Sequence, residues 1–288
     1  MTVLNCGGRR LDLSRPRVMG VLNITPDSFS DGGLTQTVGV ALYRAEAMVA
    51  AGAAVIDVGG ESTRPGAALV DAQEEIRRVA PVIEAIASRF PLPVSVDTSK
   101  PQVMRAAADA GAGLINDVRA LRLPGAIEAA ASLGLPVCLM HMKGEPPTMQ
   151  QAPVYADVVA EVIGFLRSRV GACEAAGIPR ERLLLDPGFG FGKTLTHNLA
   201  LLAGLGDLVA LGLPVLVGLS RKSMIGAITG RPVEERMAGS LAAAVLAAER
   251  GAVLVRAHDV AETVDALAVL MALRTWEGGD GGAAAVGP

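Results

Sequence analysis

Side chains that can act as acids, bases or metal ligands follow eight short apolar segments of this chain. They are Asn23, Asp57, Asp97, Asn116, His141, Asp186, Ser220 with Arg221 and Lys222, and Arg256 with His258. A single polar residue after a strand is usually a turn residue or a helix cap. Eight groups at the same place in successive segments instead indicate one shared functional site.

Two kinds of ligand chemistry are present among these residues and their neighbours. The cationic and hydroxyl side chains suited to a phosphate or diphosphate are Ser62, Thr63, Arg64, Lys222, Arg256 and His258. Asp97, Asn116 and Asp186 suit the paired N–H groups of a guanidine-like heterocycle, because a carboxylate presents two acceptor oxygens. Together they suggest a polar heterocycle that carries a diphosphate.

The apolar segments alternate with Ala-rich segments of helical spacing. We predict strands over 17–23, 53–59, 92–97, 113–118, 135–141, 182–186, 213–220 and 251–258, and helices over 36–51, 71–89, 101–110, 124–133, 155–176, 195–203, 234–250 and 259–274. Eight such units can close into an α/β fold of the (β/α)8 TIM-barrel type, whose strand ends share one face. An open doubly wound sheet is the alternative, because periodicity does not show closure.

The two ends of the chain complete a single domain over residues 1–277. The turn "CGGRR" between "TVL" and "LDL" predicts a short N-terminal hairpin over the floor of the barrel. The Gly-rich tail over 278–288 is expected to be disordered.

Composition excludes several function classes. The net charge of −3 and the 3% of aromatic residues argue against nucleic acid as a partner. Cys6, Cys138 and Cys173 lack disulfide or zinc spacing, so reduced thiols are expected. Mean hydropathy is +0.42, yet no apolar stretch reaches the roughly 18 residues of a membrane span, and the first residues have no secretory pattern. A cytoplasmic, soluble protein is predicted.

The stretch "LLLDPGFGFGKTL" (183–195) has the residue types of a phosphate-binding loop but not its spacing. A P-loop needs a glycine five positions before Gly192, where this chain has Pro187. The glycines alternate as GxGxG, which is also not the dinucleotide fingerprint GxGxxG. We therefore interpret the stretch as a strand that ends at Asp186 and a loop, and do not expect Lys193 or Thr194 to be ligands.

Eight long blocks give the chain a family resemblance. They are "MGVLNITPDSFSDGG", "DVGGESTRPGA", "VSVDTSK", "INDV", "MHMKGEPPTMQ", "DPGFGFGK", "GLSRKSMIG" and "VRAHDV". In this order they resemble the dihydropteroate synthases. The resemblance implies a (β/α)8 barrel that condenses 7,8-dihydropterin hydroxymethyl diphosphate with p-aminobenzoate, releases diphosphate and is the target of sulfonamides. Lys143 stands where glutamine is more usual.

The resemblance also implies roles for individual residues. Asp186 and Asn116 would hold the pterin edge, and Lys222 would donate to the ring without forming a Schiff base. Asn23 would be the Mg2+ ligand, a role that fits a metal bound largely by phosphate and water. Asp97 would stabilise a pterin methylene cation, which makes Asp97, Lys222 and Arg256 the catalytic set.

Further substrate-binding residues follow from the same blocks. The resemblance implies that Thr63, Arg256 and His258 hold the diphosphate. It places Phe29, Thr63, Arg64, Pro65 and Ser223 around p-aminobenzoate, and Met140 and Phe191 among the substrate contacts. The alternating glycines after Asp186 are expected to let a flat ring approach the backbone.

Three alternatives or extensions remain open at this point. A pterin-dependent methyltransferase would share Asp97, Asn116 and Asp186 but would not need the diphosphate set. A non-catalytic pterin-binding paralogue could carry the complete set of site residues and still release no diphosphate. The helices over 234–250 and 259–274 are apolar around much of their circumference, which favours a homodimer formed through them.

Overall fold

Eight parallel strands form a barrel in the computed structural model, which describes residues 3–24, 34–62, 69–145 and 148–278. The strands are β3 (Arg17–Asn23), β4 (Val55–Gly59), β5 (Val94–Asp97), β6 (Leu114–Asp117), β7 (Val137–Met140), β8 (Leu183–Asp186), β9 (Leu216–Val217) and β10 (Leu254–Ala257). Their order is β8-β7-β6-β5-β4-β3-β10-β9. A parallel bridge between Leu185 and Val215 joins β8 to the segment entering β9. The ring is therefore closed, the (β/α)8 prediction is confirmed, and the open sheet is excluded.

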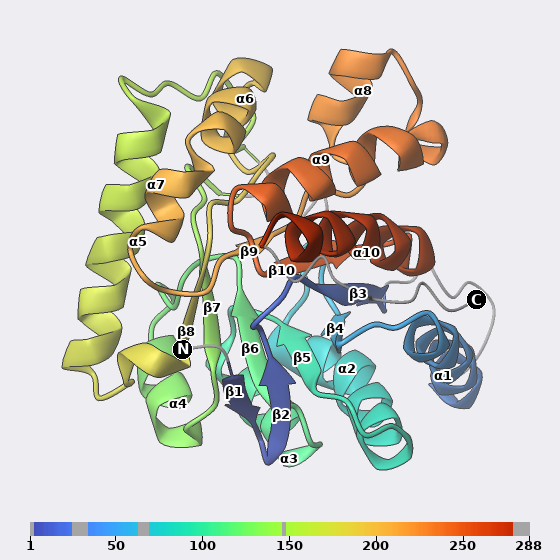
Figure 1. The fold of residues 1–288 in the computed structure, drawn as a ribbon. Coiled ribbons are helices and arrows are strands. Elements are labelled where there is room, and N and C mark those ends of the chain that lie inside the picture. Colours follow the sequence, from blue (N-terminus) through green and yellow to red (C-terminus); the bar gives the residue numbers. More distant parts are fainter. Residues whose placement is uncertain (1–2, 25–33, 63–68, 146–147, 279–288) are drawn as a thin grey trace.

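Helices surround this ring on its outer side (Figure 1). They are α1 (Leu34–Ala50), α2 (Ala72–Arg89), α3 (Pro101–Asp109), α4 (Ala126–Leu133), α5 (Val158–Ala175), α6 (Leu195–Ala203), α7 (Leu205–Val209), α8 (Ser223–Thr229), α9 (Met237–Glu249) and α10 (Val260–Glu277). All eight predicted helices are present. The sequence did not predict α7 and α8, because helices of 5 and 7 residues are too short to show a helical period.

The N-terminal hairpin closes the floor of the barrel, as predicted. Its strands are β1 (Val3–Cys6) and β2 (Arg9–Asp12). The hairpin contributes Leu4, Cys6, Leu11 and Leu13 to one buried cluster with side chains from the barrel strands, namely Met19, Val55, Leu114, Cys138, Leu184, Leu216 and Leu254. Because this end is filled by apolar side chains, the opposite end is the one left for chemistry.

The cysteines are free thiols, and all three are buried. Burial raises the pKa of the Cys6 thiol to about 12, so it is protonated and unreactive at neutral pH. No helix among the described residues has the length and apolar character to cross a membrane. The predicted tail lies, from residue 279 on, outside the described residues.

Gly113 is required where the hairpin meets the strands. A Cβ at this position would lie 2.3 Å from the carbonyl oxygen of Cys6. We expect Gly113→Ala to lower the free energy of unfolding by about 1–3 kcal/mol, because backbone on both sides must move. Gly164 in α5 is exposed and a Cβ there meets nothing within 4 Å, so Gly164→Ala should instead stabilise the protein by up to about 1 kcal/mol. Urea denaturation of both variants tests this, and equal stabilities would contradict it.

Candidate active site

Arg256 occupies the centre of the open end of the barrel. Its Nε donates to Oδ2 of Asp57 (2.6 Å) and its Nη2 donates to Oδ2 of Asp97 (2.9 Å). Asn116 also donates from Nδ2 to the same Asp57 oxygen (3.1 Å). Burial disfavours the charge on Arg256, but the two carboxylates outweigh it and raise the pKa above its ordinary value. Residues of β4, β5, β6 and β10 thus form one polar network.

The surroundings of Asp97 shift the pKa of its carboxyl group. Burial raises its pKa to about 7, Arg256 opposes that rise, and the charges of Asp57, Glu75 and Asp117 add to it. A Cβ on Gly59 would lie 3.5 Å from both the Asp97 Cβ and the Asn23 Oδ1. The bare glycine on β4 therefore lies between Asp97 and Asn23 and leaves the space between them open.

Asp186 ends β8 and faces the same mouth. Its Oδ1 accepts a hydrogen bond from the backbone N–H of Gly188 (2.7 Å). Burial raises the pKa of Asp186 to about 6, while that hydrogen bond and the charge of Lys222 oppose the rise. The carboxylate retains acceptor capacity for a ligand, because one backbone N–H does not occupy both oxygens.

Lys222 is held beside an aromatic ring and has an unused donor group. Its Nζ lies 4.1 Å from the ring centroid of Phe191, a cation–π distance. Within the described part of the chain no hydrogen bond reaches this Nζ. Burial and the Arg256 charge lower the pKa of Lys222 to about 8, against the pull of Asp186 and Asp97. A largely charged donor therefore remains free for a ligand.

His258 joins the site as a neutral donor. Burial and the charges of Arg256 and Arg221 lower its pKa to about 4, so it carries no charge at neutral pH. Its backbone N–H donates to Ser220 Oγ (3.2 Å), and that hydroxyl lies 3.0 Å from His258 Nδ1. Since Oγ already accepts from the backbone, we assign its proton to the bond with Nδ1, which leaves the proton of the ring on Nε2. The predicted diphosphate contact of His258 is therefore a neutral N–H donor.

Two polar residues at strand ends do not join the site. His141 turns into the core, where its ring packs edge-on against Phe165 at 5.0 Å and its Nδ1 lies 2.9 Å from Lys193 Nζ. Arg221 pairs with Asp259, with Nε 3.1 Å from Oδ2. A position at the end of a strand therefore does not by itself direct a side chain into the barrel mouth.

The remaining predicted contacts divide into three groups. Met140 and Phe191 lie in one small buried cluster with Val118, Met142 and Met149, so both border the Lys222 side of the mouth. Ser223 is exposed at the first position of α8. Phe29, Thr63, Arg64 and Pro65 lie outside the described residues.

The glycines after Asp186 serve packing between loops. A Cβ on Gly188 would lie 1.9 Å from the His141 carbonyl oxygen, and one on Gly192 would lie 2.2 Å from that of Lys143. Both glycines have positive φ, at 67° and 62°. The expectation that they leave room for a flat ring is therefore wrong, because their space is filled by the segment after β7. Gly190 alone borders a site residue, with Lys222 Cδ 3.1 Å from its Cβ position.

Sequence reasoning missed two groups that support the site. Asp57 is one of the polar residues predicted at the strand ends, but the sequence assigns it no role; it is fully buried and accepts from both Arg256 and Asn116. Lys100 joins Glu75 of α2 to Glu61, which follows β4, with its Nζ 2.8 Å from Glu61 Oε2. Glu75 reads as an ordinary first-turn acid of a helix, so its complete burial had no signal in the sequence.

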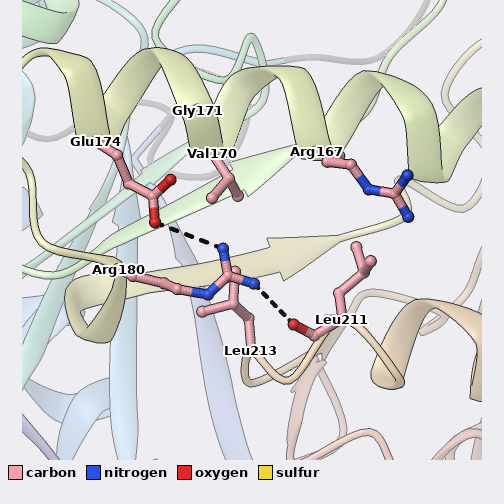
Figure 2. Close-up of a pocket in the computed structure, with 7 residues that line it drawn as sticks. All are labelled: Arg167, Val170, Gly171, Glu174, Arg180, Leu211 and Leu213. Atoms are coloured by element: carbon pink, nitrogen blue, oxygen red, sulfur yellow. Dashed lines mark hydrogen bonds and ion pairs between the residues drawn. The ribbon is translucent and has the colours of Figure 1, made fainter.

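A separate cavity of about 320 Å³ lies beside α5, away from the ends of the barrel strands that carry the polar network (Figure 2). It is bordered by α5 and by the segments that lead into β8 and β9. Its Arg180 is already paired with Glu174 (3.5 Å) and with the carbonyl oxygen of Leu211 (2.8 Å). The perturbed carboxylates and the unused donors are at the strand ends, so we place the functional site there.

Comparison with known proteins agrees with this geometry. The family model described as pterin binding enzyme matches residues 19–258. The chain belongs to the pterin binding enzyme family. Dihydropteroate synthase of Escherichia coli K12 is 59% identical over 92% of this chain and 94% of its own, and that of Haemophilus influenzae is 52% identical over 93% and 98%. The Xanthomonas albilineans dihydropteroate synthase structure with 4-aminobenzoic acid has a TM-score of 0.90 at 58% identity, covering 95% of this chain and 98% of that one.

Proposed function

We propose that this chain condenses 7,8-dihydropterin hydroxymethyl diphosphate with p-aminobenzoate to give 7,8-dihydropteroate and diphosphate. One observation carries the proposal: Asp97, Asn116 and Asp186, which suit the N–H groups of a pterin, share the barrel mouth with Arg256 and the unused donor of Lys222. Solved relatives hold 4-aminobenzoic acid, 7,8-dihydropteroate and a sulfonamide drug. The protein is thus a transferase of folate synthesis and a target for sulfonamides.

The pterin ring is recognised by acceptors on one side and a donor on the other. Asp186 accepts ring N–H groups, and Asn116, whose Nδ2 is bonded to Asp57, presents its Oδ1 as a further acceptor. Lys222 donates from Nζ to the ring carbonyl. Phe191 and Met140 give the ring an apolar border.

The proposed reaction releases an anionic diphosphate and forms a pterin methylene cation, so the site must stabilise both charges. The C–O bond to diphosphate breaks and its electron pair leaves with the diphosphate, to which Arg256, His258 and Thr63 donate. Asp97 stabilises the pterin methylene cation that remains, because a carboxylate in a partly buried site interacts strongly with developing charge. The amino group of p-aminobenzoate then attacks the methylene carbon and loses a proton.

Asn23 fits the proposed Mg2+ ion. No group of three or more His, Cys, Asp or Glu side chains that could hold a metal occurs among the described residues. Asn23 ends β3 with its Oδ1 directed into the space beside Gly59 and Asp97. A single amide oxygen suits Mg2+, which keeps water and binds substrate phosphates. When bound, the ion would neutralise charge on the leaving diphosphate.

The p-aminobenzoate site is proposed to lie beside Lys222. Ser223 is exposed at the start of α8, directly after Lys222 in the chain. Phe29, Thr63, Arg64 and Pro65 are its proposed partners. Sulfonamides would compete for this site because they resemble the arylamine.

The late helices are proposed to form a homodimer interface. Exposed apolar side chains gather on α9 and α10: Leu246 is 41% exposed, Val269 73%, Leu273 52% and Trp276 71%. Solvent-facing helices seldom carry so many exposed apolar side chains.

We also propose that the enzyme is cytoplasmic, because its buried free thiols suit a reducing compartment.

We expect light scattering at micromolar concentration to give a dimer mass, and the double variant Val269→Glu/Trp276→Glu to shift it toward monomer. The variant places charges on the proposed apolar interface. Substituting the exposed Tyr43 of α1 by Glu should leave the mass unchanged. A monomeric parent protein would refute the dimer.

Asp97→Asn should lower kcat by about 100-fold while the dissociation constant for the pterin stays within about twofold, because the charge matters chiefly in the transition state. A diphosphate-release assay with both substrates and pterin titration measure the two quantities. Equal losses in both would contradict the catalytic role, and absence of release by the parent protein would favour a binding protein.

Pterin affinity should depend on the ionisation of Asp186. Its pKa is raised to about 6, so the acceptor is intact above that pH and is lost as pH falls through 6. Binding of 6-hydroxymethyl-7,8-dihydropterin, which lacks the diphosphate, is measured between pH 5 and 7.5. Asp186→Asn should bind more weakly and show a flat profile. A parent profile without an acidic limb would contradict the assignment.

A further inference from the structure

Lys193 is a buried lysine whose donors are all used. Its side chain belongs to a residue only 3% exposed. Its Nζ lies 2.9 Å from the Gly188 carbonyl oxygen, 3.0 Å from that of Phe191 and 2.9 Å from His141 Nδ1. An ammonium group has three N–H donors, so these acceptors account for every one of them.

The acceptor nitrogen of His141 is kept free of protons. Burial and the neighbouring Lys193 charge lower the pKa of His141 to about 3. Its Nδ1 therefore accepts, and the ring is fixed by its edge-on contact with Phe165. Burial lowers the pKa of Lys193 to about 7 while Asp186 opposes the fall. Three acceptors favour the ammonium, since a neutral amine has only two N–H groups.

Gly188 and Phe191 bracket the loop after β8, so Lys193 binds both ends of its turn. The Phe191 N–H itself donates to the Gly188 carbonyl oxygen (3.1 Å). From the segment between β7 and α5, Tyr155 OH donates to the Gly192 carbonyl oxygen (2.9 Å), and Gln150 donates to that of Gly190. The carbonyl oxygens of Gly188, Gly190, Phe191 and Gly192 thus accept from protein donors.

Two groups of the site depend on the shape of this loop. Gly188 donates its N–H to Asp186, and Phe191 places its ring 4.1 Å from Lys222 Nζ. A shift of the Lys193 ammonium would move both ends of the turn, and with them the orientation of the Asp186 carboxylate and the ring beside Lys222. The lysine itself contacts neither of these two side chains through a hydrogen bond.

We propose that Lys193 is a positioning residue: its buried ammonium holds Gly188 and Phe191 so that Asp186 and Lys222 are set for the pterin. The proposal rests on the assignment of Asp186 and Lys222 to the pterin made above. It also explains why we do not expect the Gly192-Lys193 pair after this strand to bind phosphate, because the ammonium has no N–H left to offer.

The test compares Lys193→Met with Arg169→Met. Arg169 of α5 likewise donates to two backbone carbonyls, those of Ala120 (2.9 Å) and Leu121 (3.2 Å), in the connection after β6. Titration with 6-hydroxymethyl-7,8-dihydropterin gives the pterin dissociation constant, and steady-state assays give KM for p-aminobenzoate. We expect Lys193→Met to weaken pterin binding by about tenfold or more and Arg169→Met by less than about twofold, with KM for p-aminobenzoate little changed in both.

A second pair of variants applies if Lys193→Met does not fold. His141→Leu removes one acceptor of the ammonium, whereas His141→Asn can present an oxygen in its place. We expect weaker pterin binding in the Leu variant and recovery in the Asn variant. Equal pterin affinity in these two variants would overturn the proposal.

The outcomes separate this proposal from the assignment of the site. If Lys193→Met binds pterin as the parent does while Asp186→Asn and Lys222→Met bind weakly, the positioning role is wrong and the pterin site stands. Proportional losses of pterin affinity and p-aminobenzoate KM in Lys193→Met would also overturn the role, since they indicate general loosening. If Asp186→Asn and Lys222→Met bind pterin normally, the assignment of the site itself fails.

Discussion

The partly buried guanidinium of Arg256 is the charge on which the arrangement of the site depends. A cation in this position is costly unless carboxylates compensate it. Asp57, 199 residues away in the sequence, and Asp97 supply that compensation from β4 and β5. Because β10 and these strands must be brought together for the ion pairs to form, the barrel and the polar network require each other.

Three carboxylates of the same residue type have different tasks because their surroundings differ. Asp57 is fully buried and one of its oxygens already accepts from both Arg256 and Asn116, so it serves as structural support. Asp97 and Asp186 lie at the mouth with pKa values raised to about 7 and about 6. Groups whose ionisation is shifted in this way and that face a ligand are those suited to binding and catalysis.

The strands and the face of the site could be predicted because both follow from local patterns: apolar runs end in polar residues, and parallel strands align their ends. The direction in which each side chain points could not be predicted in this way. His141 and Arg221 occupy equivalent positions but are drawn away by Lys193 and Asp259. Short-range sequence also gave no indication of α8, which places Ser223, or of the ion pairs that bury Glu75. These features depend on contacts between segments that lie far apart in the chain.

The loop after β8 shows how similar residue types can have opposite uses. In a phosphate-binding loop, glycines free backbone N–H groups to surround an anion and the lysine extends toward it. Here Gly188 and Gly192 make room for the carbonyls of the segment after β7, and Lys193 turns inward to two carbonyls of its own loop. In the proposed reaction the diphosphate then finds its donors elsewhere, and among the described residues we assign Arg256 and the Nε2 of His258 to it, together with Thr63, which lies outside them. The same packing that removes Lys193 from the surface holds Phe191 beside Lys222, so in the proposed reaction the ring lies beside the loop after β8 and the diphosphate beside the end of β10.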